Sequence, residues 1–128
     1  MTDTDKNSYR TITPYLVVAD ANAELKFLAA AFGGVETECQ RNDDNSVMHA
    51  EVKVGDSLVM LGQSGGEFKA LQAAFYLWVQ DVDQVYAKAL AAGGTSQSPP
   101  ENKPYGHRNA GVYDPGGNTW WIAAPSKK

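Results

Sequence analysis

Residues 18–34 read VADANAELKFLAAAFGG, and residues 79–94 read VQDVDQVYAKALAAGG. Each stretch leaves an apolar run of β-forming residues at an aspartate, Asp20 or Asp81, continues as an alanine-rich segment and stops at two glycines. Aspartate is a typical helix N-cap, and glycine is a typical residue just beyond a helix end. The repeated pattern therefore predicts two similar strand–helix units in tandem.

The segments around these units complete the two modules. Alternating or β-branched runs predict strands over 9–18, 35–41, 47–54, 57–61, 73–79, 107–113 and 118–123. The segment 96–105 carries three prolines and few apolar residues, so we expect a loop there. The coarse order is βαβββ twice, an α+β arrangement in which the second strand of the later copy is the weakest.

Periodicity also predicts which side chains are buried. In the strand over 47–54, Met48, Ala50, Val52 and Val54 are expected to point to one side, opposite His49, Glu51 and Lys53. The apolar face of the first helix is expected to contain Leu25, Leu28, Ala29 and Phe32. That of the second is expected to contain Val82, Val85, Tyr86, Ala89 and Leu90.

Length and charge exclude several classes of function. A chain of 128 residues fits one domain, divided into a disordered tail (1–8), a first module (9–62), a linker (63–72) and a second module (73–124). The net charge is −4 and the basic residues are scattered, so neither nucleic acid nor a membrane is the expected partner. Cys39 is the one cysteine, and the N-terminus has no export signal, so we expect a cytoplasmic protein.

Five stretches carry a resemblance to a known family: ITPYL (12–16), HAEVKVGD (49–56), VQDVD (79–83), YGHR (105–108) and DPGGNTW (114–120). With the repeat, they resemble the glyoxalase, bleomycin-resistance and extradiol-dioxygenase (vicinal oxygen chelate) superfamily, and within it the PhnB-like branch. The resemblance implies an open, barrel-like mixed sheet around a cleft, with the helices on the outside. It also implies a homodimer.

Enzymes of this superfamily hold a divalent metal in the cleft, which stabilises negative charge on substrate oxygens. Aligned on the helix motifs, the corresponding positions in this chain are Thr13, Ala74 and Trp121, with His49 at a fourth. Thr13, Ala74 and Trp121 are poor metal ligands, whereas an open catalytic site needs about three good ones. We therefore expect no metal or other cofactor. If a metal is present, His49 and Glu51 are its expected ligands, with His107 as a third if its strand faces the cleft.

The expected cleft is lined by aromatic side chains with polar tips, which suits a flat or amphipathic small molecule. The candidate ligand-binding residues are Tyr15, His49, Glu51, Tyr76, Trp78, Tyr105, His107, Arg108 and Trp121. Trp78 and Trp120 are also candidates for the core. Arg108 either binds an anionic ligand or tethers its loop to Asp114 or to carbonyl groups. The sequence leaves open whether His107 or Arg108 faces the cleft, because it does not fix which alternate residues of the strand over 107–113 point inward.

Three functions follow. The first is a metal-free protein of the bleomycin-resistance type that binds a small amphipathic or aromatic molecule, in a groove between two subunits. The second is a metal-dependent lyase, isomerase or dioxygenase of the glyoxalase type that uses His49 and Glu51. The third is an acid–base enzyme without a metal that relies on the same pair. The missing metal ligands favour the first.

Overall fold

The computed structural model describes residues 9–126, and the disordered tail predicted over residues 1–8 lies outside this range. The first module consists of β1 (Tyr15–Val18), α2 (Ala21–Phe32), β2 (Val35–Arg41), β3 (Val47–Val54) and β4 (Ser57–Gln63). The second module consists of β5 (Ala74–Trp78), α3 (Val82–Ala91), β6 (Thr95–Asn102), β7 (His107–Tyr113) and β8 (Thr119–Pro125).

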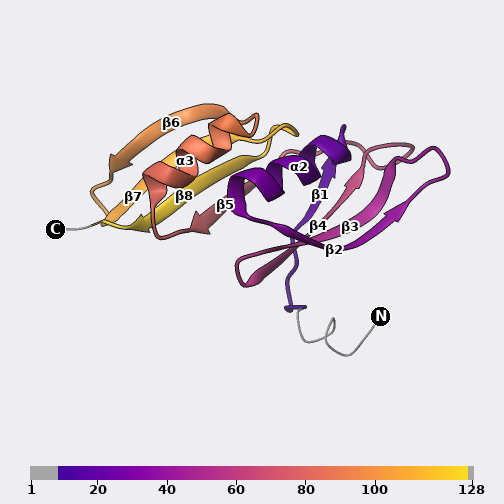
Figure 1. The fold of residues 1–128 in the computed structure, drawn as a ribbon, viewed down its shortest axis with the longest axis horizontal. Helices are drawn as coiled ribbons and strands as arrows, with labels where there is room; N and C mark the ends of the chain where they lie inside the picture. Colours follow the sequence, from indigo (N-terminus) through magenta and orange to yellow (C-terminus); the bar gives the residue numbers. More distant parts are fainter. Residues whose placement is uncertain (1–8, 127–128) are drawn as a thin grey trace.

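Each module forms its own four-stranded mixed sheet, in the order β1-β4-β3-β2 and β5-β8-β7-β6. The first strand runs parallel to the last, and the other neighbours are antiparallel. The modules lie side by side, and their sheets do not close into a barrel (Figure 1). This confirms the predicted α+β fold with two tandem modules and an open sheet.

The two helices begin where the sequence predicts. The Asp20 side chain accepts a hydrogen bond from the Ala23 N–H at 3.1 Å, and the Asp81 side chain accepts one from the Gln84 N–H at 3.1 Å. These carboxylates satisfy backbone donors that a helix N-terminus leaves unpaired. Each helix packs on one face of its own sheet, and the two helices contact each other (Figure 1). The second face of each sheet therefore carries no helix. Among the described helices, none is long and apolar enough to cross a membrane.

The buried face of α2 differs from the prediction, whereas the face predicted for α3 is confirmed. Phe27 and Ala31 are buried, while Ala29 is exposed and Leu25 only half-buried. The reason is that α2 also faces the second module: a Cβ on Gly94 would lie 3.0 Å from the Phe27 ring. The apolar stripe is thus rotated toward the junction between the modules.

A bulge in β3 overturns one detail of the predicted alternation. Gln40 pairs with His49 but Arg41 pairs with Val47, so Met48 is an extra residue in the ladder. Val47 consequently enters the core, and Met48 is exposed on the face without a helix.

Two predicted boundaries are wrong. The segment predicted as the loop 96–105 is mostly strand β6, which lies at the edge of its sheet and pairs with β7 through two register shifts. Prolines are tolerated there because an edge strand has unpaired positions. The first strand starts at Tyr15 instead of residue 9. Pro14 precedes it, and the Pro14 carbonyl accepts a hydrogen bond from the Met60 N–H at 2.9 Å.

A buried carboxyl group joins the two modules. Glu24 of α2 is fully buried, and its Oε1 accepts a hydrogen bond from the Gly116 N–H of the β7–β8 turn at 3.2 Å. Position 116 admits no side chain, because a Cβ would lie 2.6 Å from Val18 Cγ1. As a carboxylate, Glu24 leaves Oε2 without a donor among the described residues. Burial, a hydrogen bond to Asp114 and the charge of Asp114 together raise the pKa of Glu24 to about 9, so the protonated form predominates at neutral pH.

Candidate functional site

Each module holds a tyrosine of its first strand against a histidine of its third strand. The Tyr15 hydroxyl lies 3.2 Å from His49 Nδ1, and the Tyr76 hydroxyl lies 2.8 Å from His107 Nδ1. Their ring centroids are 5.6 and 5.7 Å apart. Both pairs lie on the face without a helix, because their strand neighbours Leu16, Ala50 and Leu77 point into the core. The sequence repeat therefore extends to a repeated Tyr–His pair.

In the first module, a buried carboxylate backs the pair. His49 Nε2 lies 2.8 Å from Glu51 Oε2, and the Tyr9 hydroxyl donates to Glu51 Oε1 at 2.8 Å. When Tyr15 donates to Nδ1, the Nε2–H of a neutral His49 donates to Glu51. The arrangement is a hydrogen-bonded chain from Tyr15 through His49 and Glu51 to Tyr9.

In the second module, an amide takes the place of the carboxylate. Asn109 follows His107 by two residues, as Glu51 follows His49, and is 3% exposed. Its Nδ2 donates to the Tyr76 and Tyr105 hydroxyls, both at 3.0 Å. Because the Tyr76 oxygen accepts from Asn109, its own proton is directed to His107 Nδ1. Asn109 was not among the predicted site residues, although an alignment of the segments His49-Ala50-Glu51 and His107-Arg108-Asn109 places it opposite Glu51.

Aromatic rings cluster around His107. The centroid of Trp78 lies 4.8 Å from that of His107 at an interplanar angle of 82°, and Tyr105 lies at 5.1 Å and 90°. Tyr76 and Trp78 are 5.2 Å apart. Such edge-to-face contacts are favourable for aromatic pairs. Trp78 is 56% exposed, so its alternative assignment to the core is wrong, whereas Trp120 is buried as expected.

A hollow of about 460 Å³ lies beside this cluster, and we call it the module 2 hollow. It is lined by Tyr76, Gln97, Ser98, Lys103, Tyr105, Asn109 and Trp121. Trp121 pairs with Tyr76 in the β5–β8 ladder, which places both side chains on the same face. Predicted site residues from two strands and one turn thus meet here.

The first module has a separate hollow of about 700 Å³, the module 1 hollow. Tyr15, Val17, Met48 and Phe68 supply its apolar wall. Asp44 lies on its rim, where hydrogen bonds from the Ser46 hydroxyl and N–H lower the pKa of the Asp44 carboxyl. His49 and Glu51 are not among the residues that line it.

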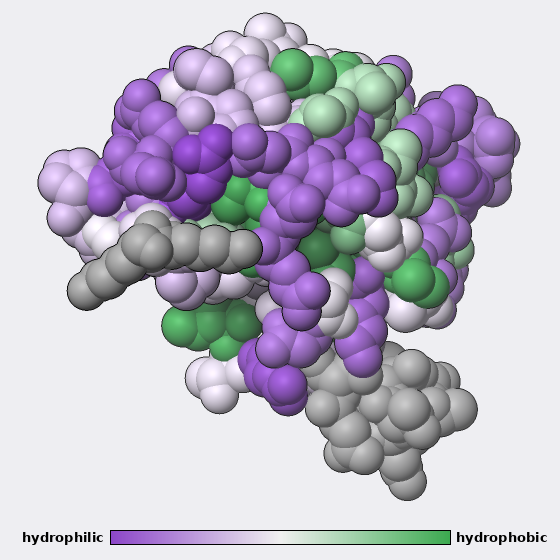
Figure 2. Space-filling view, turned by 60° about the vertical axis from the view of Figure 1, so that its left-hand side comes forward, coloured by the Kyte–Doolittle hydropathy of each residue, from purple (hydrophilic) through white to green (hydrophobic). Residues whose placement is uncertain are grey.

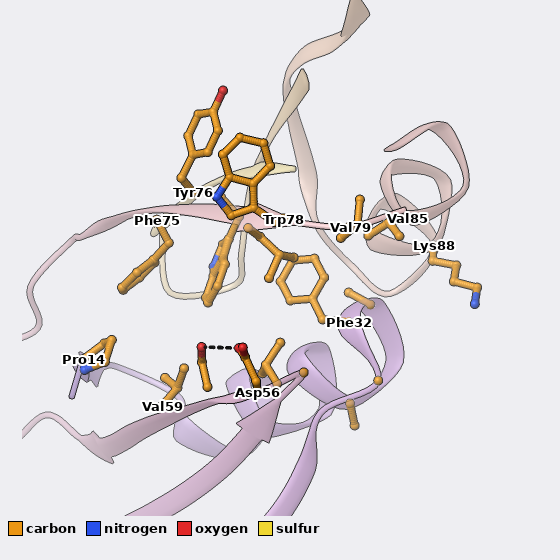
Figure 3. Close-up of a pocket in the computed structure, with 18 of the residues that line it drawn as sticks. Pro14, Phe32, Asp56, Val59, Phe75, Tyr76, Trp78, Val79, Val85 and Lys88 are labelled. Carbon is orange, nitrogen blue, oxygen red and sulfur yellow. Dashed lines mark hydrogen bonds between the residues drawn. The ribbon is translucent and has the colours of Figure 1, made fainter. Parts of the chain in front are cut away.

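A third hollow, of about 650 Å³, lies between the modules. Figure 3 shows Phe75 of β5 pointing into it from one side, with Pro14 and Val59 on the other side. Tyr76 and Trp78 are also among its lining residues, but their rings extend from the opposite side of the same strand (Figure 3). No histidine lines it, and its charged side chains are those of Asp56 and Lys88.

Arg108 lies apart from the other predicted site residues. Arg108 directly follows His107 in β7, so the two side chains point to opposite faces of the sheet. The Arg108 guanidinium donates two hydrogen bonds to Asp83 of α3, Nε to Oδ1 at 2.8 Å and Nη2 to Oδ2 at 2.9 Å. This bidentate pair raises the pKa of Arg108 and lowers that of Asp83. The structure therefore places His107 on the face without a helix and Arg108 on the helix side. Its tether is Asp83, not Asp114.

The predicted site residues form two groups. One group lies on the helix-free face of the second sheet and consists of Tyr76, Trp78, Tyr105, His107 and Trp121. The other lies on the helix-free face of the first sheet and consists of Tyr15, His49 and Glu51. The hollows that contain Tyr15 and Trp121 share no lining residue. Figure 2 turns the side of the second module forward and shows a largely hydrophilic surface with separate hydrophobic patches, one of them in a recess.

The donor set does not fit the metal site of the superfamily. Thr13, Ala74 and Trp121 stand at three ligand positions, and residues 9–126 contain no group of three His, Cys, Asp or Glu side chains arranged to hold a metal. His49 and Glu51 bond each other directly, which uses Nε2 and one carboxylate oxygen. A catalytic site with three protein ligands is therefore not assembled by the described part of the chain.

Residues 10–122 match the Glyoxalase/Bleomycin resistance protein/Dioxygenase superfamily, and the chain belongs to it. It is 30% identical to the uncharacterized protein Mb0911c from Mycobacterium bovis, over 91% of this chain and 84% of that protein.

Solved structures share the fold. TioX from Micromonospora sp. ML1 superposes with a TM-score of 0.74 at 23% identity, over 93% of this chain and 98% of TioX. The fosfomycin resistance protein FosX from Mesorhizobium loti superposes with a TM-score of 0.68 at 15% identity, over 91% and 92% of the two chains. At these identities the similarity supports the fold and says nothing of the ligand.

Proposed function

We propose that the protein binds a small aromatic or amphipathic molecule on the face of its second sheet, in the manner of the bleomycin-resistance branch and without a divalent metal. The observation that carries the proposal is the aromatic cluster that Asn109 holds in place. One buried amide donates to two tyrosine hydroxyls, and Tyr76 in turn donates to His107. The rings are positioned before any ligand arrives, which lowers the entropic cost of binding.

The exposure of these rings supports the same conclusion. Tyr76, Trp78 and Tyr105 are exposed large side chains on one face, next to a hollow floored by Trp121. When a flat molecule stacks on these neighbouring rings, their exposed apolar surface becomes buried, which favours binding. The nearby tyrosine hydroxyls, the Asn109 amide and the His107 imidazole can orient such a molecule through hydrogen bonds.

We propose further that a second copy of the chain completes the site. Within one chain, the Tyr15–His49–Glu51 group and the Trp121 hollow occupy separate sheets. A homodimer that sets the first face of one copy opposite the second face of the other unites all the predicted residues except Arg108. Sedimentation velocity should then give a dimer at micromolar concentration, and a monomer would contradict this arrangement.

Ligand binding is tested with a neutral aromatic probe. We expect 2-naphthamide to quench tryptophan fluorescence saturably, and Trp121→Ala to weaken its binding about tenfold, which corresponds to the loss of one stacked ring. Tyr113→Ala is the matched control, since Tyr113 is a partly exposed aromatic at the end of β7 outside the hollow. Equal affinity in both variants, or no saturable binding by the wild type, overturns the proposal.

The adjacency of His49 and Glu51 supports a second candidate, a metal-dependent lyase, isomerase or dioxygenase of the glyoxalase type. Their side chains are 2.8 Å apart, so both reach one point. Native mass spectrometry after incubation with zinc, nickel, manganese or cobalt separates the two candidates. One metal per chain that His49→Ala abolishes would establish the second candidate. Adducts that persist in this variant, or none, support the first. The PhnB-like assignment and the cytoplasmic location stay predictions.

A further inference from the structure

Lys103 is positioned at the rim of the module 2 hollow by its own backbone. Its N–H donates to the His107 carbonyl at 2.7 Å, and its carbonyl accepts from the Gly106 N–H at 3.2 Å. These bonds close the tight turn between β6 and β7. The Lys103 side chain is 26% exposed and is the one charged side chain among the residues that line the hollow.

The present partner of Lys103 is easily displaced. The Lys103 ammonium donates to Glu101 Oε1, and this bond raises the pKa of Lys103 and lowers that of Glu101, so both groups are charged at neutral pH. Glu101 does not line the hollow, and its side chain is 59% exposed. Exposed ion pairs contribute little free energy because water solvates both partners well. A ligand carboxylate can therefore replace Glu101 at low cost.

Tyr105 adds a second donor at the same place. Its oxygen accepts a hydrogen bond from Asn109 Nδ2 at 3.0 Å, so its own proton points elsewhere. No acceptor for this proton is found among residues 9–126. An ammonium group and a phenolic O–H thus line one hollow together with the indole of Trp121. This combination matches an anion attached to an aromatic ring.

We propose that the module 2 hollow selects aromatic anions, with the ring on Trp121 and the acid group between Lys103 and Tyr105. The inference rests on the proposed small-molecule function and adds to it the chemical class of the ligand. The attraction between the Lys103 ammonium and the acid group makes the hollow prefer anions. The contact between the ligand ring and Trp121 contributes equally to the affinity for charged and for neutral ligands.

The test compares 2-naphthoate with 2-naphthamide, which have the same ring and differ in charge. We expect the wild type to bind 2-naphthoate about fivefold more tightly, the size of one exposed charge contact. Lys103→Gln should abolish the preference, and Lys103→Arg should keep it. Glu101→Gln should strengthen 2-naphthoate binding two- to threefold, because it removes the carboxylate that competes for Lys103. This corresponds to about half the free energy of one exposed charge contact. Lys88→Gln on α3 is the control and should change neither affinity.

The outcomes separate this inference from the function on which it rests. If both probes bind equally to wild type and to Lys103→Gln, the hollow binds aromatic molecules without charge selection, and only this inference is wrong. If neither probe binds to the wild type, the proposed function fails with it. Thermal unfolding of each variant shows whether it is folded, and the opposite effects expected of Lys103→Gln and Glu101→Gln cannot both arise from a loss of folding.

Discussion

The two modules share a geometry, but the first carries carboxyl groups at positions where the second carries none. In the first, Tyr15 and His49 are backed by the carboxylate of Glu51; in the second, Tyr76 and His107 are backed by the amide of Asn109. The strand positions are equivalent, since each backing residue follows its histidine by two. A carboxylate only accepts hydrogen bonds, whereas an amide also donates. Asn109 can therefore hold two tyrosines, and Glu51 instead receives a histidine and a tyrosine.

The helices show the same difference. Glu24 stands four residues after the N-cap Asp20, and the equivalent residue after Asp81 is Val85. Glu24 is fully buried against the turn of the other module, while Val85 is a half-buried apolar contact. In both comparisons the first module carries a carboxyl group where the second carries a side chain that cannot ionise. The repeat has kept its backbone geometry while its chemistry has diverged.

The largest expected effect comes from replacing the buried titratable carboxyl group of α2, Glu24. In the folded protein the pKa of Glu24 is raised from 4.5 to about 9, so the folded state retains a proton that the unfolded state releases above pH 4.5. Stability is therefore expected to fall as pH rises from about 4.5 to 9. Each unit of difference corresponds to about 1.4 kcal/mol, so the total decrease amounts to several kcal/mol.

Urea unfolding of Glu24→Gln at pH 5, 7 and 8.5 measures this effect. The glutamine amide can donate to Asp114 as the protonated acid does, so the variant should lose most of the pH dependence and exceed the wild type in stability at pH 8.5. Glu36→Gln on the exposed strand β2 is the control and should keep the wild-type profile. Parallel profiles for Glu24→Gln and the wild type would show that Glu24 is not the titrating group.

A smaller effect is expected from removing the amide of the second module. Asn109→Leu keeps the volume but removes two hydrogen bonds, so we expect a loss of about 2 kcal/mol in the free energy of unfolding. Tyr105 also loses its positioning, and the affinity for 2-naphthoate should decrease. Unchanged probe affinity in a folded Asn109→Leu variant would contradict the role of Asn109 in positioning the tyrosines.

The two tyrosines give the most direct comparison. Tyr76→Phe removes a hydroxyl that bonds both His107 and Asn109, with an expected loss of about 1 kcal/mol. Tyr15→Phe removes one longer hydrogen bond of 3.2 Å, and its loss should be smaller. Urea unfolding at neutral pH ranks the variants. A larger loss in Tyr15→Phe would mean that the first module is the more rigid of the two.

The smallest effect is expected at Arg108. Its ion pair with Asp83 is exposed, so Arg108→Gln should reduce stability only slightly and leave the affinity for 2-naphthoate unchanged. His107→Ala, one residue away, should weaken probe binding because it removes a ring from the cluster. A reversed order of effects in the same fluorescence titration would place Arg108, and not His107, at the site.

Much of the fold could be predicted because its signals are local. Asp20 and Asp81 cap their helices through contacts three residues away, and the alternating apolar residues of the sequence 47–54 mark a strand. The errors arose where pairing partners override local preference. The prolines of β6 are accommodated by an edge position and shifted register, and Met48 is displaced by a bulge that only the partner strand reveals.

The site was predicted less completely than the fold. The candidate residues Tyr76, His107 and Trp121 could be chosen from the sequence because aromatic and titratable side chains stand out in it. The sequence did not decide whether His107 or Arg108 faces the candidate site, because either set of alternate residues in 107–113 could point to that face. Asn109 and Glu24 were not recognised as important, since an asparagine in a strand and a glutamate in the first turn of a helix have ordinary local explanations.

The sequence alone therefore determined the two-module α+β architecture, the helix boundaries and the scarcity of metal ligands, because each depends on residue identity and short spacings. The tertiary structure decided which side chains meet. Tyr76 and Asn109 are 33 residues apart, Tyr15 and His49 are 34 apart, and Glu24 and Gly116 are 92 apart. Hydrogen bonds across such distances depend on strand order and register, which follow from the packing of the whole chain.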